Sequence, residues 1–237
     1  MAKRPVLVLA LALSTFHSAW ASPQAVVELF TSQGCSSCPP ADALLSELAR
    51  RPEIVALTLP VDYWDYLGWK DTLAHSVFTA RQRAYAGARG DRQVYTPQAV
   101  VNGGESCVGS NRAKIERLMA VRSELPVPVA AAETGDRIAI DVGAGERVEG
   151  AAVWLLPVAR VRTVPISRGE NRGRTATYAN VVRGFTRVGI WTGEPARFEV
   201  PIAAAREGEA DAYVVLLQDI RQGAPGAILG AAKSPGF

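Results

Sequence analysis

ELFTSQGCSSCPP, residues 28–40, is the stretch that decides the fold of this chain. The apolar run from Ala25 to Phe30 leads into it and is typical of a buried strand, and Gln33-Gly34 predicts a turn. Pro39-Pro40 suits the first turn of a helix, where the missing N–H groups would have had no partner. The two cysteines, Cys35 and Cys38, are therefore expected where a strand turns into a helix.

The patterns around this stretch predict the order β-α-β-α-β-β-α for residues 22–123. The apolar residues that follow the cysteines recur at helical spacing, at Ala41, Leu44, Leu45 and Leu48. A helix between two strands implies that the strands are parallel. The other expected elements are a strand over 54–61, a helix over 71–88, strands over 98–101 and 106–108, and a helix that contains Ile115, Leu118 and Met119.

The sequence changes in character after a linker expected at 124–128. Short alternating or β-branched runs follow, separated by Gly, Pro and charged turns, and no helical pattern interrupts them. We expect residues 129–237 to form a smaller all-β domain, sandwich-like in form. The expected fold is thus an α/β domain followed by a smaller β-rich domain.

The N-terminal segment predicts export. Lys3 and Arg4 precede an apolar run, and Ala19-Trp20-Ala21 places small residues where signal peptidase cuts, so residues 1–21 are interpreted as a signal peptide. The apolar run is too short for a stable membrane anchor. The mature protein is expected to be periplasmic or secreted, without membrane insertion, in a compartment where disulfides persist.

The charge of the mature chain is nearly balanced. The whole chain of 237 residues has 26 basic and 23 acidic side chains, and loss of Lys3 and Arg4 with the signal peptide leaves a net charge of +1. This balance gives no argument for nucleic acid or an anionic membrane as partner. Three cysteines are too few for a disulfide-stapled scaffold, which favours a chemical role or one structural bridge.

The spacing of Cys35 and Cys38 permits dithiol chemistry. Unpaired N–H groups and the positive end of the dipole at a helix N-terminus stabilise a thiolate, so Cys35 is the expected nucleophile. Cys38 would resolve the mixed disulfide by attacking Cys35. Glu28 lies in an otherwise apolar strand, and we expect it to accept the proton of Cys38; the alternative is an ordinary surface glutamate.

The same spacing has two other interpretations, a metal site and an inert structural bridge. A structural zinc site needs four ligands, and the mature chain adds only Cys107 and His75, without paired spacing. Copper bound by the two cysteines and His75 is the better metal alternative, although His75 also fits a helix cap. We expect no cofactor, no resident metal, and Cys107 as a small buried apolar residue.

An aromatic loop over residues 62–70 is the second candidate for binding. Trp64 and Trp69 are expected to face a substrate near the dithiol, since exposed aromatic residues anchor many interfaces. The alternative is that these rings pack the junction between the two domains.

Residues 25 to about 120 resemble the thioredoxin superfamily in their order of elements around Cys-x-x-Cys. The resemblance implies that Pro97 is cis and lies beside the dithiol, with Thr96-Pro97 binding the substrate backbone. It also implies a buried acid six residues before the first cysteine, whereas Glu28 precedes Cys35 by seven.

The closer resemblance is to a family of uncharacterised bacterial secreted proteins that have a thioredoxin-like domain and a C-terminal β-rich domain. Its strings include residues 28–40, Val61-Asp62-Tyr63-Trp64-Asp65, Thr79-Ala80-Arg81-Gln82-Arg83, Tyr95-Thr96-Pro97-Gln98 and Arg168-Gly169-Glu170-Asn171. We expect an exported thiol-disulfide oxidoreductase, reductase- or isomerase-like, acting on protein thiols or disulfides, with the second domain giving partner specificity. The alternative is a non-enzymatic secreted protein whose dithiol binds copper or forms a bridge.

Overall fold

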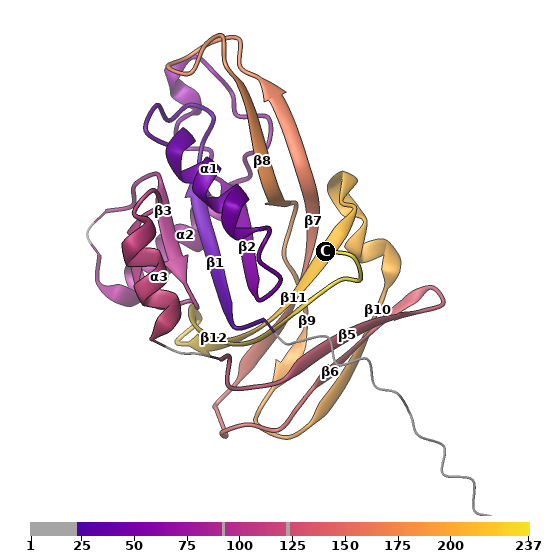
Figure 1. Cartoon of the computed structure of the whole chain (residues 1–237). Helices are drawn as coiled ribbons and strands as arrows, with labels where there is room; N and C mark the ends of the chain where they lie inside the picture. The colour runs from indigo at the N-terminus through magenta and orange to yellow at the C-terminus, as the bar shows by residue number, and fades with distance from the viewer. Residues whose placement is uncertain (1–22, 92, 122–123) are drawn as a thin grey trace, which may run out of the picture.

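The computed structural model describes residues 23–91, 93–121 and 124–237, so the expected signal peptide lies outside the described residues. The chain folds as a mixed α/β protein in which strands predominate (Figure 1). A nine-stranded sheet forms its centre, and a three-stranded sheet packs beside it. Across the described ranges, the helices are all too short or too polar to cross a membrane.

The elements expected in the first half are all present. They are β1 (Ala25–Thr31), α1 (Pro39–Leu48), β2 (Ile54–Pro60), α2 (Ser76–Arg89), β3 (Gln98–Val101), β4 (Ser106–Val108) and α3 (Arg112–Ala120). As expected, β1 and β2 are parallel. Helix α2 begins later than position 71, because the His75 side chain caps it by accepting a hydrogen bond from Val77 N at 3.1 Å.

The second half contains strands and short 3-10 turns. The strands are β5 (Val129–Thr134), β6 (Arg137–Val142), β7 (Ala151–Pro165), β8 (Thr175–Val182), β9 (Thr186–Trp191), β10 (Ala196–Pro201), β11 (Ala212–Arg221) and β12 (Ala224–Lys233). β10, β6 and β5 form the smaller sheet. Its apolar side chains, such as Ile138 and Ile140, share a core with Val153 and Val215 of the large sheet.

The two halves of the chain share the large sheet, whose order is β12-β11-β7-β8-β2-β1-β3-β4, with β9 beside β7. The link is between β2 and β8, which run parallel and pair at Thr58 and Val181. Thr58 Oγ1 also donates a hydrogen bond to Ala179 O at 2.6 Å. β8 thus satisfies an edge that β2 would otherwise leave open. The expected domain boundary at 124–128 therefore does not separate two sheets, and a division into domains there stays a prediction.

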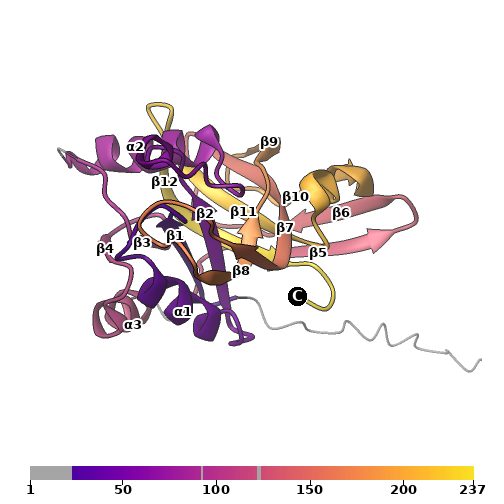
Figure 2. The same ribbon diagram turned by 90° about the horizontal axis from the view of Figure 1, so that it is seen from above.

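The helices cover opposite faces of the sheet (Figure 2). Helices α1 and α3 pack on the face that includes Val27 and Leu29, and α2 packs on the face that includes Val26 and Phe30. The core under α2 also contains residues of β7, β11 and β12, so the sheet curls around this helix. The curl brings β12 to the β3–β4 turn, where a Cβ on Gly103 would lie 2.3 Å from the Gly226 carbonyl oxygen.

Candidate functional site

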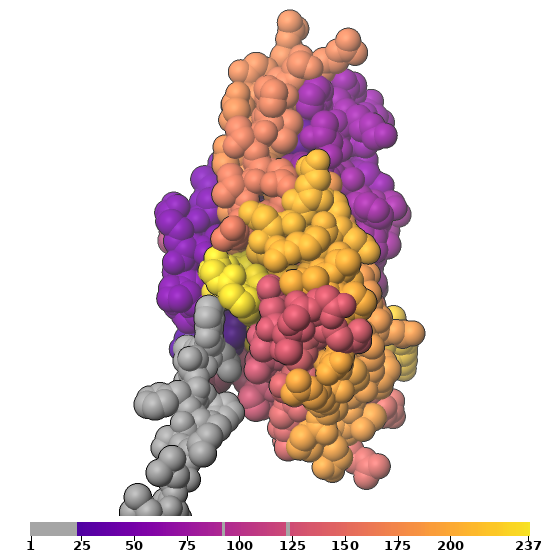
Figure 3. All heavy atoms as spheres, turned by 90° about the vertical axis from the view of Figure 1, so that its right-hand side faces the viewer, coloured from indigo at the N-terminus to yellow at the C-terminus, as the bar shows by residue number. Residues whose placement is uncertain are grey.

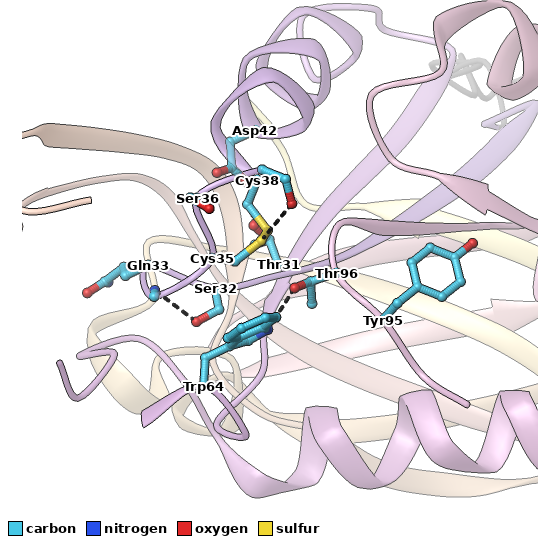
Figure 4. Close-up of a disulfide and its surroundings, with 12 residues drawn as sticks. Thr31, Ser32, Gln33, Cys35, Ser36, Cys38, Asp42, Trp64, Tyr95 and Thr96 are labelled. Carbon is cyan, nitrogen blue, oxygen red and sulfur yellow. Dashed lines mark hydrogen bonds between the residues drawn. A yellow bond between two sulfur atoms is a disulfide. The ribbon is translucent and has the colours of Figure 1, made fainter. Parts of the chain in front are cut away.

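The cysteines form a disulfide in the loop between β1 and α1, which we call the dithiol loop (residues 32–38). Figure 4 shows the bond lying between the start of α1 and the Thr96 segment. Cys35 is 1% exposed and Cys38 is fully buried, whereas Ser36 and Ser37 are exposed. The predicted role of Cys35 as nucleophile requires that a substrate can reach this residue. In the oxidised protein, access to Cys35 therefore depends on the segments that cover it.

The helix N-terminus offers fewer amide donors than the sequence suggested. Pro39 and Pro40 have no N–H, and the next two amides, of Ala41 and Asp42, donate to Cys38 O at 2.9 and 3.1 Å. Cys38 is itself the residue before the helix. The contact recorded for the Cys35 sulfur is with Ser37 Oγ at 3.4 Å. Stabilisation of a Cys35 thiolate by helix amides is therefore weaker than expected, because these donors already have acceptors.

A buried acid, Asp42, lies one helical turn after Cys38 (Figure 4). Its side chain accepts a hydrogen bond from Thr31 Oγ1 at 2.7 Å and it is 9% exposed. Burial, more than the opposing Thr31 hydrogen bond, raises the pKa of Asp42 to about 7, and the charge of Asp71 adds to this. Asp42 was not among the predicted site residues. Its position four residues after Cys38 could have indicated that the two side chains lie close together, since residues four apart share a helix face.

Glu28 is not where its predicted role requires it to be. It lies on the α2 face of β1, opposite α1, and is fully buried. Its carboxylate accepts hydrogen bonds from Arg81 Nε at 2.6 Å and Tyr85 Oη at 2.6 Å. Arg81 also donates to Gln218 of β11 at 3.0 Å. The physical reason is the period of two along a strand, which turns residue 28 away from the helix that follows the cysteines. Glu28 is thus part of a buried ion pair that joins the two halves.

Trp64 and Trp69 are half-buried and each makes a hydrogen bond to a residue of the site, whereas substrate binding by the two rings stays a prediction. Trp64 Nε1 donates to Thr96 Oγ1 at 2.7 Å, and Trp69 Nε1 donates to Gln33 Oε1 at 2.8 Å. The Thr96-Pro97 peptide bond is cis. Within the aromatic loop, Tyr66 is the exposed ring, at 79%. The loop therefore supports the dithiol loop and leaves one aromatic side chain in solvent.

Asp71 ties the aromatic loop to the dithiol loop. Its carboxylate accepts hydrogen bonds from Gln33 N and Leu73 N, both at 2.8 Å. Burial raises its pKa against the lowering effect of these amides. Asp42 and Asp71 both raise the pKa of Tyr178 on β8, after burial as the main cause. Asp42 of α1, Asp71 and Tyr178 of β8 therefore lie near enough for the two carboxylate charges to affect the tyrosine.

The two further residues considered as metal ligands, His75 and Cys107, have other roles in the fold. His75 caps α2, and Cys107 is a free thiol packed in the core under α1 and α3 with 8% exposure. Burial raises the pKa of the Cys107 thiol. Among residues 23–91, 93–121 and 124–237, no cluster of three or more His, Cys, Asp or Glu side chains has a geometry suited to a metal ion.

The second half supplies two residues to the dithiol loop. Asn171, in the turn between β7 and β8, donates through Nδ2 to Gln33 O and Cys35 O, both at 2.9 Å. Glu170 accepts a hydrogen bond from Ser36 N at 3.3 Å. Both residues belong to a string that the sequence analysis singled out, although it gave them no role.

Comparisons with known proteins place these residues in a family context. A family model described as "Protein of unknown function (DUF1223)" matches residues 26–218. A solved structure, protein AGR_C_4864 from Agrobacterium tumefaciens, is 38% identical with a TM-score of 0.82, over 91% of this chain and 96% of that one. The structure of HBP35 of Porphyromonas gingivalis is similar in fold alone, with 12% identity and a TM-score of 0.58, over 90% of this chain and 75% of that one. No curated protein matches.

Proposed function

Because this chain belongs to the family described as a protein of unknown function (DUF1223), its activity has to come from its own site, and we propose an exported thiol-disulfide oxidoreductase of thioredoxin-like architecture. The observation that carries the proposal is the Cys35–Cys38 disulfide one helical turn before a buried carboxyl group whose pKa is raised to about 7. A proton acceptor tuned near neutral pH beside a dithiol is typical of a redox centre.

The reaction begins with the reduced protein. The Cys35 thiolate attacks one sulfur of a substrate disulfide, so a Cys35–substrate bond forms, the substrate bond breaks, and the first substrate sulfur leaves as a thiolate that takes a proton. Cys38 then attacks Cys35, the intramolecular disulfide forms, and the second substrate sulfur leaves. Two electrons pass to the substrate, and a partner dithiol must return two electrons to the protein.

Asp42 takes the role that the sequence analysis gave to Glu28. Cys38 has to lose a proton before it attacks, and the Asp42 carboxylate, one turn along α1, is the acceptor we assign. The Thr31 hydroxyl, which donates to Asp42 at 2.7 Å, fixes the orientation of the carboxyl group. Thr96-Pro97 is proposed to bind the substrate backbone. Thr96 lies near the disulfide in Figure 4, and Trp64 holds it through a hydrogen bond.

A reducing or isomerising role fits the local electrostatics better than strong oxidation. A strongly oxidising dithiol needs a highly stabilised Cys35 thiolate. Here the first helical residues are prolines, and Ser36 N already donates to a carboxylate, that of Glu170. Both features weaken thiolate stabilisation, which leaves the disulfide comparatively stable.

The burial of both sulfurs favours a second candidate, a structural bridge without redox exchange. Reduction of insulin by the wild-type protein and by the Cys35→Ser and Cys38→Ser variants separates the two. The oxidoreductase predicts activity that both substitutions abolish, and a mixed disulfide trapped on Cys35 in the Cys38→Ser protein. A wild-type dithiol that neither reduces nor oxidises protein substrates would favour the bridge.

A further inference from the structure

The turn between β7 and β8, which we call the cap loop (residues 166–174), covers the dithiol loop. It comes from the second half of the chain, about 130 residues away along the sequence from Cys35, yet Asn171 is only 3% exposed against the dithiol loop. Figure 3 shows the hairpin tip, in orange, at one end of the molecule beside purple segments of the first half. Cys35, whose carbonyl group accepts a hydrogen bond from Asn171, is 1% exposed.

The cap loop is attached to the dithiol loop by few bonds. Asn171 Nδ2 donates to the carbonyl groups of Gln33 and Cys35 at 2.9 Å each, and Glu170 accepts from Ser36 N at 3.3 Å. The Glu170 bond is exposed to solvent. Asn171 Oδ1 is buried and makes no hydrogen bond with any described residue, which disfavours the closed position. The closed position is therefore held by two buried hydrogen bonds, one exposed hydrogen bond and the close packing of Gly169 against Trp69, and it is opposed by one unpaired acceptor.

The cap loop is a compact turn with its own internal hydrogen bonds. Its backbone is closed on itself by hydrogen bonds from Ile166 N to Arg174 O at 2.9 Å and from Gly173 N to Ile166 O at 2.8 Å. The ribbon that carries it pairs from Val158–Val182 out to Pro165–Thr175, whereas β8 pairs with β2 at Val181. The outer part of the hairpin is thus a two-stranded ribbon that extends past the sheet (Figure 1). Such ribbons have little stability of their own.

We propose that the cap loop gates Cys35, with Asn171 as the latch, and that opening of the cap admits the partner that exchanges electrons with the dithiol. The inference rests on the proposed function and adds its regulation. A substrate would replace the Asn171 donors with donors of its own at the carbonyl groups of Gln33 and Cys35. Asn171 is a positioning residue here, since it contacts the backbone and takes no part in electron transfer.

The test is the rate at which the oxidised protein reacts with dithiothreitol. One reagent thiolate attacks the Cys35 sulfur, the Cys35–Cys38 bond breaks, and Cys38 leaves as a thiolate that takes a proton. The second reagent thiol then closes a cyclic disulfide and releases Cys35, so two electrons enter the protein. The reverse reaction uses the cyclic oxidised reagent.

Asn171→Ala should raise the rate about tenfold, as expected for the loss of two neutral hydrogen bonds. A gate changes forward and reverse rates by the same factor, so the equilibrium with dithiothreitol should stay unchanged. Asn180→Ala is the control for a general loosening of β8, because Asn180 is a buried asparagine of that strand that donates to Ala56 O at 3.0 Å, away from the dithiol loop. Its exchange rate should stay within twofold of wild type.

Three results would overturn the proposal. They are an unchanged rate in Asn171→Ala, an equal gain in Asn180→Ala, and a gain in one direction only, which would mean that Asn171 stabilises one redox state. If Asn171→Ala does not fold, exposed Glu170 gives a second test. Glu170→Gln keeps an acceptor without the charge and Glu170→Ala removes both, so the Ala variant should react about threefold faster than the Gln variant. Equal rates in these two variants would also count against the gate.

The same experiment distinguishes the failure of the gate from the failure of the proposed function. Reaction with dithiothreitol requires only the disulfide, whereas the proposed function requires exchange with a protein substrate. A tenfold faster reaction of Asn171→Ala with dithiothreitol, together with no reduction of insulin by either protein, would support the gate and refute the oxidoreductase. If the wild-type protein reduces insulin but Asn171→Ala does not change the rate of reaction with dithiothreitol, the oxidoreductase is supported and the gate is refuted.

Discussion

Replacement of Asp42 by asparagine should remove a pH dependence that the buried carboxyl group gives to both stability and exchange. Asn keeps an oxygen that accepts the Thr31 hydrogen bond but cannot ionise. Burial raises the pKa of Asp42 from 3.8 to about 7. A difference of about three units corresponds to about 4 kcal/mol of unfolding free energy, at about 1.4 kcal/mol for each unit.

The sign follows from proton binding. Between the unfolded pKa of 3.8 and the folded pKa of about 7, the folded protein holds a proton on Asp42 that the unfolded chain has released. The free energy of unfolding therefore falls as the pH rises through this window, and levels off above it. Asp42→Asn should lose this slope and be more stable than wild type above pH 7, by up to about 4 kcal/mol. Urea unfolding of the oxidised proteins across the window measures the difference.

Asp42→Asn should slow disulfide exchange, although it stabilises the folded protein. Without the carboxylate, Cys38 has no acceptor for its proton, so the resolving step should slow about a hundredfold near neutral pH and the mixed disulfide on Cys35 should accumulate. Thr31→Val is the graded control. It removes the hydrogen bond that lowers the pKa of Asp42, so it should move the pH midpoint of resolution upward without abolishing it. A stability difference between wild type and Asp42→Asn that is constant with pH, or unchanged resolution, would refute the reasoning.

Three further substitutions test the surroundings of the dithiol. Glu170→Gln removes a carboxylate that accepts from Ser36 N, so reduced Cys35 should react faster with an alkylating reagent at neutral pH and low salt. A gain of the same size in high salt would contradict a solvent-screened charge. Glu28→Gln leaves Arg81 buried without its counter-charge and should lower the free energy of unfolding in urea by about 3–5 kcal/mol. The pH midpoint of the step in which Cys38 resolves the mixed disulfide should stay unchanged in the folded protein. Loss of this midpoint would mean that Glu28 is the proton acceptor. Cys107→Ala should lower the unfolding free energy by about 1 kcal/mol through a small cavity and leave insulin reduction intact, and a lost activity would give this free thiol a redox role.

The local parts of the fold could be predicted because each has a pattern of its own. The strand before the cysteines, the prolines at the helix start and the leucines of α1 all lie within 25 residues, and the structure contains the corresponding β1 and α1. Strands β5, β8 and β12 have no comparably clear pattern of their own, and none of the three was predicted. β12 is rich in alanine and glycine, which are poor strand formers, and it is a strand because it pairs with β11 along its length.

The roles of the acids could not be predicted for a related reason. An aspartate in the first turn of a helix ordinarily faces solvent and favours the helix dipole, so Asp42 gave no signal of burial. It is buried because β8 packs across α1, a contact between residues more than a hundred positions apart. Glu28 was expected beside Cys38 because the strand leads to the dithiol, but only the alternation of the strand decides which face it reaches.

The burial of Asp42 and the latch on the dithiol loop depend on the same hairpin. β8 carries Tyr178, whose pKa responds to the charges of Asp42 and Asp71, and the loop that precedes β8 carries Asn171. An opening of the cap loop that also displaced Tyr178 would let water reach Asp42 and remove the main cause of its raised pKa. Asp42 would then ionise when a substrate enters, at the moment when Cys38 needs an acceptor, and bind the proton again when the hairpin closes over the new disulfide. Under the two proposals together, access to Cys35 and the proton affinity of Asp42 would be coupled through one element, which the second half of the chain provides.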